Sequence, residues 1–377
     1  MTGSGEPESK PSAPRASRKT KFALAAVATT LSLGLGECAL RLYEKREQAR
    51  QGAGDDAWRE RIRRMNRTIY RRSPVPGLVY EPTPNTWVPM PYGPAGFNTG
   101  AMRDNREHTV DPDPARPRVA MIGDSLVWSE EVGLEDTLPR RVEEALASRH
   151  AEVLNFGVTG YDTAQEALWF EQHVRAYHPR VAVVVFCMND VMIMSGPYNR
   201  FATPEESARK DAQDALLDRL APVRAETLDD IASRAVEASP FHLFTRTRWA
   251  LRRAFYSRSA DYRDEYTTLY VEPAHRARLH DAIAQLGRVV VASGARAHFV
   301  ISPVLRDFAH YHWRSIHEWV ASEARAAGFT VHDPLDEFVA HERAESMRVP
   351  GDSLHYDPRG QRVFARFIAR AIASDVR

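Results

Sequence analysis

Residues 118–128 read RVAMIGDSLVW, a short apolar run that stops at Gly123-Asp124-Ser125 and is followed by an amphipathic stretch. This arrangement is typical of a buried strand that turns directly into a helix. Glycine, aspartate and serine are favoured at such a turn with or without any chemistry, because they tolerate unusual dihedral angles and cap free N–H groups. The stretch therefore predicts a strand-to-helix turn, and whether Ser125 is also a nucleophile depends on the rest of the chain.

The rest of the chain repeats this strand-then-helix pattern. Short runs rich in valine and isoleucine alternate with amphipathic stretches, which predicts an α/β protein with a parallel sheet and helices on both faces. We expect strands at 118–122, 152–156, 180–187, 297–302 and, more weakly, 329–332, and helices near 136–148, 163–177, 274–292, 311–327 and 358–373. In such sheets a ligand binds beyond the carboxyl ends of the strands.

The composition is that of an ordinary globular enzyme or binding protein. The chain has 377 residues, of which 43% are hydrophobic, enough for one large domain with attachments or for two domains. With 51 Lys and Arg against 50 Asp and Glu, the charge gives no reason to expect a nucleic acid as partner. The two cysteines, Cys38 and Cys187, make neither a disulfide framework nor a zinc site.

The N-terminal part predicts a membrane attachment. Residues 1–21 are expected to form a disordered basic tail, and residues 22–42 a signal anchor or transmembrane helix. This helix would contain Glu37, which can form an ion pair with Arg41, four residues later. A cleaved signal peptide, or neither, stays open as an alternative, although no convincing cleavage site follows. We expect the bulk of the chain outside the cytoplasm, because long C-terminal domains translocate largely regardless of flanking charge.

Two further regions flank or interrupt the sheet pattern of the main domain, 116–375. Residues 43–115 are predicted to contain a charged juxtamembrane helix at 55–72 and then an extended proline-rich segment lying against that domain. Residues 195–272 are predicted to be a helical insertion that begins with a capping box at Thr203-Pro-Glu-Glu206. Its arginine-rich amphipathic stretch at 240–258 indicates either a lid on the core or a contact with a membrane surface or anionic polymer.

Polar residues follow three of the predicted strands and precede the final helix, all at the same expected edge. Ser125 follows the first strand, the loop Asn155-Phe-Gly-Val-Thr-Gly160 the second, and Asn189-Asp190 the third, while Asp352-Ser-Leu-His355 precedes the final helix. Acyl transfer needs a hydroxyl nucleophile, a base, a carboxylate that orients the base, and donors for the oxyanion. We therefore predict Ser125 as nucleophile, His355 as base and Asp352 as its orienting carboxylate. The predicted oxyanion donors are the N–H groups of Ser125 and Gly160 and the Asn189 amide.

Other interpretations of these residues remain open. A second Asp-x-x-His, Asp307-Phe-Ala-His310, also follows a strand and could be the true pair. Asn189-Asp190 could be only a helix cap, and Gly160 could simply relieve a tight turn. The nearby His310, His312 and His317 could coordinate a metal, although no carboxylate spacing supports it.

The four blocks resemble those of the SGNH hydrolases, or GDSL-type esterases: Gly123-Asp124-Ser125-Leu126, Gly160, Asn189-Asp190 and Asp352-x-x-His355. The resemblance implies a three-layer α/β/α fold of flavodoxin type and hydrolysis of esters or thioesters without metal or cofactor. It departs from the family in having Cys187-Met188 before Asn189, where glycine is frequent. Residues 97–103 resemble a segment of membrane-anchored bacterial members, so we expect a single-pass inner-membrane protein with an extracytoplasmic catalytic domain.

The resemblance implies less about the substrate, because the family acts on lipid, carbohydrate and small-molecule esters. We expect a serine esterase acting on an acyl or acetyl ester of an envelope carbohydrate or lipid. The alternatives are a polysaccharide O-acetyltransferase and a non-catalytic glycan-binding module with the same fold.

Overall fold

The computed structural model describes residues 27–29, 32–41, 60–194, 196–220, 245, 247–248, 265–341, 344–349 and 352–376. The chain divides into two compact units, one of residues 57–227 with 258–377 and one of residues 1–56 with 228–257. The first unit contains the sheet and the candidate site. Within the described ranges, no helix combines the length and the apolar character needed to cross a membrane.

In the second unit, residues 27–29 and 32–41 are helical. The predicted pairing of Glu37 with Arg41 is confirmed, because Arg41 Nε donates to Glu37 Oε1 at 2.9 Å. The tail at 1–21, the remaining residues of the 22–42 segment, and the 240–258 stretch apart from 245, 247 and 248 lie outside the described residues.

The first unit is built on a five-stranded parallel sheet with the strand order β6-β5-β7-β8-β9. The strands are β5 (Arg118–Gly123), β6 (Glu152–Gly157), β7 (Val181–Phe186), β8 (Arg296–Ile301) and β9 (Thr330–His332). Met121, in the middle of β5, pairs with Asn155 on one side and Val183 on the other. Each predicted strand is present and its ends differ by at most one residue. The strands β5, β6 and β7 are buried along their whole length, and β8 is buried except at Arg296, whereas the three-residue edge strand β9 is partly exposed.

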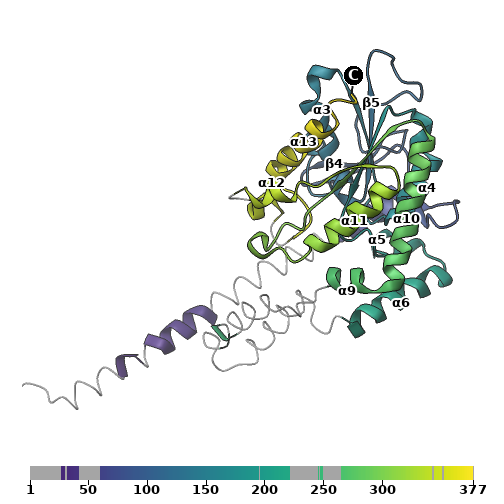
Figure 1. Ribbon diagram of the computed structural model, residues 1–377. Coiled ribbons are helices and arrows are strands. Elements are labelled where there is room, and N and C mark those ends of the chain that lie inside the picture. The colour runs from purple at the N-terminus through teal and green to yellow at the C-terminus, as the bar shows by residue number, and fades with distance from the viewer. Residues whose placement is uncertain are drawn as a thin grey trace, which may run out of the picture. The chain divides into compact units, whose positions relative to one another are not determined.

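Alternate residues of the central strands enter two separate cores. Val119 and Met121 pack with helices α3 (Leu138–Ala145) and α13 (Pro358–Ile372), whereas Ala120 and Ile122 lie in the core shared with the opposite helices. The opposite layer consists of α4 (Thr163–Gln172), α10 (Pro273–Ala292) and α11 (Arg314–Ala326). Figure 1 shows α3 beside α13, and α4, α10 and α11 on the other side of the sheet. This is the three-layer α/β/α arrangement that the sequence predicts.

The helix ends differ more from the predictions than the strand ends. The helix predicted at 136–148 is shortened to α3 and flanked by 3₁₀ turns at Leu134–Asp136 and Ala147–Arg149. The helix predicted at 163–177 ends at Gln172 and continues as a 3₁₀ turn at Val174–Tyr177. The prediction for 311–327 begins three residues early, since Tyr311 is still extended. Near the C-terminus the chain also forms the short helix α12 (Leu335–Val339) and a 3₁₀ turn at Ala344–Met347.

The proline-rich segment is more structured than predicted. Instead of one extended run it forms two antiparallel hairpins, β1 (Tyr70–Arg72) with β2 (Tyr80–Pro82) and β3 (Thr86–Met90) with β4 (Gly93–Phe97). Pro89 and Pro94 lie within β3 and β4, directly opposite each other, and the other residues of these short ladders supply the N–H groups. The predicted docking on the main domain is confirmed, because Gln165 of α4 donates to the Leu78 carbonyl at 3.0 Å. Of the charged helix predicted at 55–72, residues 60–69 are helical and residue 70 already belongs to β1.

The described residues of the 195–272 range form α5 (Gly196–Phe201), α6 (Pro204–Leu220) and α9 (Glu265–Val271). The predicted capping box is confirmed: Thr203 N–H donates to Glu206 Oε2 at 2.7 Å, and Glu206 N–H to Thr203 Oγ1 at 3.2 Å. Glu206 also pairs with Arg72 of β1 at 2.6 Å, so α6 contacts the first hairpin.

Candidate active site

Ser125 is the first residue of helix α2 (Ser125–Trp128), which follows β5 without a loop. Asp124 caps this helix, because its carboxylate accepts a hydrogen bond from Leu126 N–H at 2.9 Å. The helix lies close to the end of β6: a Cβ atom on Gly157 would come within 2.1 Å of Trp128 N. The turn therefore holds Ser125 at the carboxyl edge of the sheet, where parallel α/β sheets bind ligands.

The structure joins Ser125, His355 and Asp352 in one hydrogen-bonded chain. Ser125 Oγ lies 2.7 Å from His355 Nε2, and His355 Nδ1 lies 2.7 Å from Asp352 Oδ2. The second carboxylate oxygen of Asp352 accepts from the N–H groups of Leu354 at 2.7 Å and His355 at 3.0 Å. Leu305 N–H, beyond β8, donates to the Ser353 carbonyl at 2.7 Å and ties this loop to the sheet edge.

In the Ser125–His355–Asp352 chain, two opposing effects set the charges of His355 and Asp352: burial and the hydrogen bond between the two side chains. Burial opposes the charged imidazole, but the hydrogen bond and charge of Asp352, with Glu130 and Asp124 nearby, outweigh it and raise the pKa of His355 to about 9. Burial alone would raise the pKa of Asp352, yet the hydrogen bonds from His355 lower it to about 2. An ionised Asp352 can thus hold the imidazole in the tautomer that presents Nε2 to Ser125.

Two backbone donors at this edge have no protein acceptor among the described residues, the N–H groups of Ser125 and Gly160. Gly160 takes a φ of 77°, a conformation that glycine adopts without strain. Its loop is bound to the end of β5 by the hydrogen bond from Val158 N–H to the Gly123 carbonyl, 3.0 Å long. Unpartnered N–H groups at a helix start and in a glycine turn are able to stabilise an oxyanion.

Asn189 and Ser125 both contact the carboxylate of Asp124. Its Nδ2 donates to Asp124 Oδ2 at 3.2 Å, and Ser125 Oγ also lies 3.2 Å from that oxygen. The turn that carries Asn189 is fixed by Asp190, which accepts from Cys187 N–H at 2.6 Å. Cys187 and Met188, the departure from the frequent glycine, are buried in the two cores and leave the Asn189 amide beside Asp124.

Two acidic side chains near the triad were not predicted. Glu131 is half-buried, and one of its carboxylate oxygens lies within 4.8 Å of ligand atoms of His355 and Asp352. Glu130 is 93% buried, and burial together with the charge of Glu131 raises its pKa to about 7. Ser129 ends α2 in a left-handed conformation, with φ 59° and ψ 57°, just before these two residues. A left-handed turn produces no periodic pattern of hydrophobic residues. The sequence therefore showed that Glu130 and Glu131 are adjacent, but not that they lie near the triad.

Arg103 holds the loop that carries these acids. Its buried guanidinium donates to the carbonyls of Trp128 and Ser129, and to the Val132 carbonyl at 2.6 Å. Its Cζ also lies 4.2 Å from the centre of the Trp128 ring, and burial lowers its pKa to about 10. The segment at 97–103 therefore contributes a positioning contact to the site.

The alternative Asp-x-x-His pair lies elsewhere. His310 is exposed in a 3₁₀ turn at Phe308–His310, and only its backbone N–H contacts Asp307, through the carbonyl at 2.8 Å. His317 does not join it as a metal ligand, because its Nδ1 bonds Asp333 at 2.9 Å and its Nε2 bonds Tyr311 at 2.9 Å. In the described part of the chain, the group close enough to share a cation is Glu131, Asp352 and His355.

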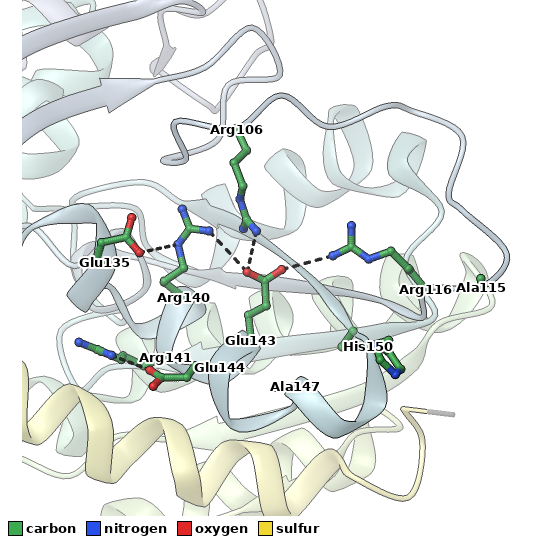
Figure 2. A pocket seen from close by; sticks show the side chains of 11 residues that line it. Arg106, Ala115, Arg116, Glu135, Arg140, Arg141, Glu143, Glu144, Ala147 and His150 are labelled. Carbon is green, nitrogen blue, oxygen red and sulfur yellow. Dashed lines mark hydrogen bonds and ion pairs between the residues drawn. The ribbon is translucent and has the colours of Figure 1, made fainter.

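A hollow of about 800 Å³ lies at the opposite end of the sheet, lined by residues that precede β5 and β6 and by the outer side of α3. Its arginines already have acidic partners. Figure 2 shows Arg106 and Arg140 directed at Glu143, at 2.8 and 3.5 Å, and Arg141 directed at Glu144. The hollow is therefore lined by ion pairs, and Ser125 is not one of its lining residues.

The three-layer fold, with Ser125 at the carboxyl edge of its parallel sheet, is that of a hydrolase that acts on ester bonds. Residues 121–363 match the GDSL-like lipase/acylhydrolase family, and the chain belongs to this family. No curated protein matches the sequence.

The chain is similar to solved structures of an acetyl xylan esterase, a lipase/acylhydrolase and a psychrotrophic esterase. The acetyl xylan esterase AlAXEase is 12% identical with a TM-score of 0.40, over 68% of this chain and 99% of that one. The lipase/acylhydrolase from Enterococcus faecalis is 12% identical with a TM-score of 0.38, over 68% and 95%. The psychrotrophic esterase EstA from Pseudoalteromonas sp. is 10% identical with a TM-score of 0.35, over 68% and 97%.

Proposed function

We propose that this protein is a membrane-anchored serine esterase that removes an acyl or acetyl group from an envelope carbohydrate or lipid. The observation that carries the proposal is the Ser125–His355–Asp352 chain, with 2.7 Å at both contacts, beside two backbone N–H groups that have no acceptor among the described residues. A nucleophile, a base with its orienting acid and preorganised oxyanion donors are the parts that acyl transfer requires.

In the proposed reaction, Ser125 Oγ attacks the ester carbonyl carbon while His355 Nε2 takes the hydroxyl proton. The N–H groups of Ser125 and Gly160, with the Asn189 amide, stabilise the negative oxygen of the tetrahedral intermediate. His355 then gives its proton to the leaving alcohol, and an acyl group remains on Ser125. Water, activated by His355, attacks this acyl-enzyme, and release of the acid restores the serine.

The acidic surroundings of the triad support a substrate that is uncharged near the ester. Glu130, Glu131 and Asp352 lie around His355, so an anionic group on the substrate would meet like charges there. The hydroxyl groups of a carbohydrate can instead donate hydrogen bonds to these carboxylates. An acetylated sugar fits this chemistry, and transfer to a second sugar hydroxyl in place of water is the variant of the same reaction.

The proposed anchor and extracytoplasmic location are supported by the apolar run at 22–40 and by the resemblance of residues 97–103 to membrane-anchored bacterial members. Protease treatment of intact spheroplasts tests the location. Digestion of the C-terminal domain is expected, and its full protection would contradict the proposal.

The esterase activity is tested by Ser125→Ala with p-nitrophenyl acetate as substrate. The wild type should hydrolyse it, and Ser125→Ala should lose roughly 10³-fold or more of that rate. His355→Ala should lose activity as well, whereas His310→Ala should keep it. Equal background rates for wild type and Ser125→Ala would contradict the enzyme proposal, and the reverse behaviour of the two histidines would select the other Asp-x-x-His. Comparing acetate release with acetyl transfer to an oligosaccharide separates hydrolase from transferase.

A further inference from the structure

The Thr159–Gly160 peptide is held by a residue that lies far from it in the sequence. The carbonyl of this peptide, Thr159 O, accepts a hydrogen bond from the Tyr80 hydroxyl at 2.7 Å. The N–H of the same peptide, that of Gly160, has no acceptor among the described residues. On the other side of Thr159, its own N–H donates to the Tyr70 hydroxyl at 3.2 Å. Two tyrosine hydroxyls thus fix the residue before the candidate oxyanion donor.

Both tyrosines are themselves firmly placed. Tyr80 is fully buried and Tyr70 is 3% exposed, and their rings pack edge to face with 5.4 Å between centres. The two residues lie on the paired strands β1 and β2. Tyr161, which follows Gly160, donates its hydroxyl to the Tyr80 carbonyl at 2.7 Å. The first hairpin and the Gly160 loop are therefore joined in both directions.

We propose that Tyr80 is a positioning residue for the oxyanion hole, an inference that rests on the proposed esterase function. A peptide unit is planar, so fixing its carbonyl also fixes the direction of its N–H. A hydrogen bond accepted by the carbonyl also polarises the peptide and makes the N–H a stronger donor. By bonding Thr159 O, Tyr80 aims the Gly160 N–H at the place where the oxyanion forms and strengthens its donation there.

The space around Gly160 is consistent with this role. A Cβ atom at position 160 would lie 3.1 Å from Tyr80 Oη, so a side chain there would press on the hydroxyl that holds the peptide. Residues 70 and 80 also lie outside the 121–363 region that matches the family. The N-terminal hairpin therefore supplies a part of the active site that the family region lacks.

The test is Tyr80→Phe in the full chain, assayed with p-nitrophenyl acetate. Loss of one oxyanion donor costs roughly 10²- to 10³-fold in kcat, and a donor that remains but is held loosely should cost less. We expect kcat to fall about tenfold, KM to stay within about twofold, and the pH midpoint to stay unchanged. A boronic acid that forms a tetrahedral adduct on the serine should bind Tyr80→Phe weaker by a similar factor.

The matched control is Tyr198→Phe. Tyr198 is also buried and donates its hydroxyl to a backbone carbonyl, that of Glu206, at 3.1 Å, but it does not bond the Gly160 loop. This variant should keep kcat and boronate affinity. Thermal unfolding of both variants shows whether each is folded at the assay temperature.

Three outcomes would overturn the proposal. One is a folded Tyr80→Phe with kcat within twofold of wild type, and another is an equal loss of kcat in Tyr198→Phe. If Tyr80→Phe does not fold, Tyr70→Phe decides, because it frees the other side of Thr159: an unchanged kcat there overturns the proposal and a several-fold loss supports it. Failure of the esterase function itself is distinct, since wild type and Ser125→Ala would then be equally inactive.

Discussion

Burial and three carboxylates, those of Asp352, Glu130 and Asp124, govern the protonation of His355. The raised pKa of about 9 means that the neutral imidazole, the form able to act as a base, is populated only as the pH approaches that value. We expect kcat/KM to rise with pH up to a midpoint near 9. In Asp352→Asn this midpoint should move down, because the group that holds the charge on His355 is lost, and kcat should fall as well. A wild-type midpoint near the ordinary histidine pKa would contradict this.

The same shifts affect stability in a defined pH window. His355 has a raised pKa, so its stabilising contribution is complete below the unfolded value of about 6.5 and is lost as the pH rises through 9. Asp352 has a lowered pKa, so its contribution is present above about 4 and is lost as the pH falls through 2. The loss of unfolding free energy in His355→Ala, measured by urea denaturation, should thus be largest between about pH 4 and 6.5. A loss that grows towards pH 10 would contradict it.

Glu131 should discriminate against anionic esters. At pH 9 and low salt the wild type is expected to prefer methyl 4-acetoxybenzoate to 4-acetoxybenzoate, whose leaving group carries a charge. Glu131→Gln should narrow this ratio of kcat/KM by roughly three- to tenfold, since one repulsive charge is removed. Glu135→Gln is the control, because Glu135 has a side chain 75% exposed and lies on Arg140. An unchanged ratio in Glu131→Gln would show that the substrate charge is not sensed there.

At this scale the sequence could predict the residues whose positions follow from strand ends. Ser125 and Asn189 meet because parallel strands end at one edge, and the loop from Asp352 to His355 is tied to that edge by the hydrogen bond from Leu305 N–H to the Ser353 carbonyl. Of the two Asp-x-x-His pairs, the sequence already favoured Asp352–His355, and the 2.7 Å contact between His355 Nε2 and Ser125 Oγ agrees with that choice. Glu130, Glu131 and Tyr80 were missed for another reason: their places depend on a left-handed turn at Ser129 and on the docking of a hairpin from far upstream.

The contact between α2 and β6 sets the position of the nucleophile. Gly157→Ala would place a methyl group 2.1 Å from Trp128 N and 2.6 Å from Val127 C, both of which are backbone atoms that cannot rotate away. We expect a loss of about 1–3 kcal/mol in unfolding free energy and a loss of activity as α2 is displaced. Gly294→Ala is the control for activity: its φ of 82° strains an alanine there and can lower stability, but no atom lies within 4 Å of its Cβ, so it should keep activity. Full activity in Gly157→Ala would show that α2 is not held by this contact.

The elements themselves were predictable to different degrees. Strands such as β7, with the sequence VAVVVF, are apolar on both faces and could be recognised as buried. Helix ends were less certain because 3₁₀ turns continue several helices, as at Val174–Tyr177. The hairpins β1–β2 and β3–β4 were missed because their strands are short and contain proline, so no alternating pattern develops.

Across the whole molecule, Arg103 joins the N-terminal segment to the loop behind Ser125. Arg103→Ala would remove a donor from three carbonyls, of which that of Ser129 keeps the hydrogen bond from Val132 N–H, and we expect the unfolding free energy to fall by about 3 kcal/mol. Arg359→Ala is the comparison, because the Arg359 side chain is 58% exposed in its pair with Asp357. This substitution should lower the unfolding free energy by less than about 1 kcal/mol. Urea unfolding followed by tryptophan fluorescence measures both. Equal stability of wild type and Arg103→Ala would contradict the role given to this arginine.

The hairpin that bonds Thr159 has a consequence for how the protein loses activity. The β1–β2 pair contributes few ladder hydrogen bonds and is held mainly by buried side chains such as Tyr70 and Tyr80. Its opening therefore costs the burial of these rings but leaves the hydrogen bonds of the five-stranded sheet intact. Such an opening would release the Gly160 peptide without disturbing the Ser125–His355–Asp352 chain. Hydrolysis should therefore decline at lower urea concentrations than the circular dichroism of the sheet, so that turnover reports whether the hairpin is docked.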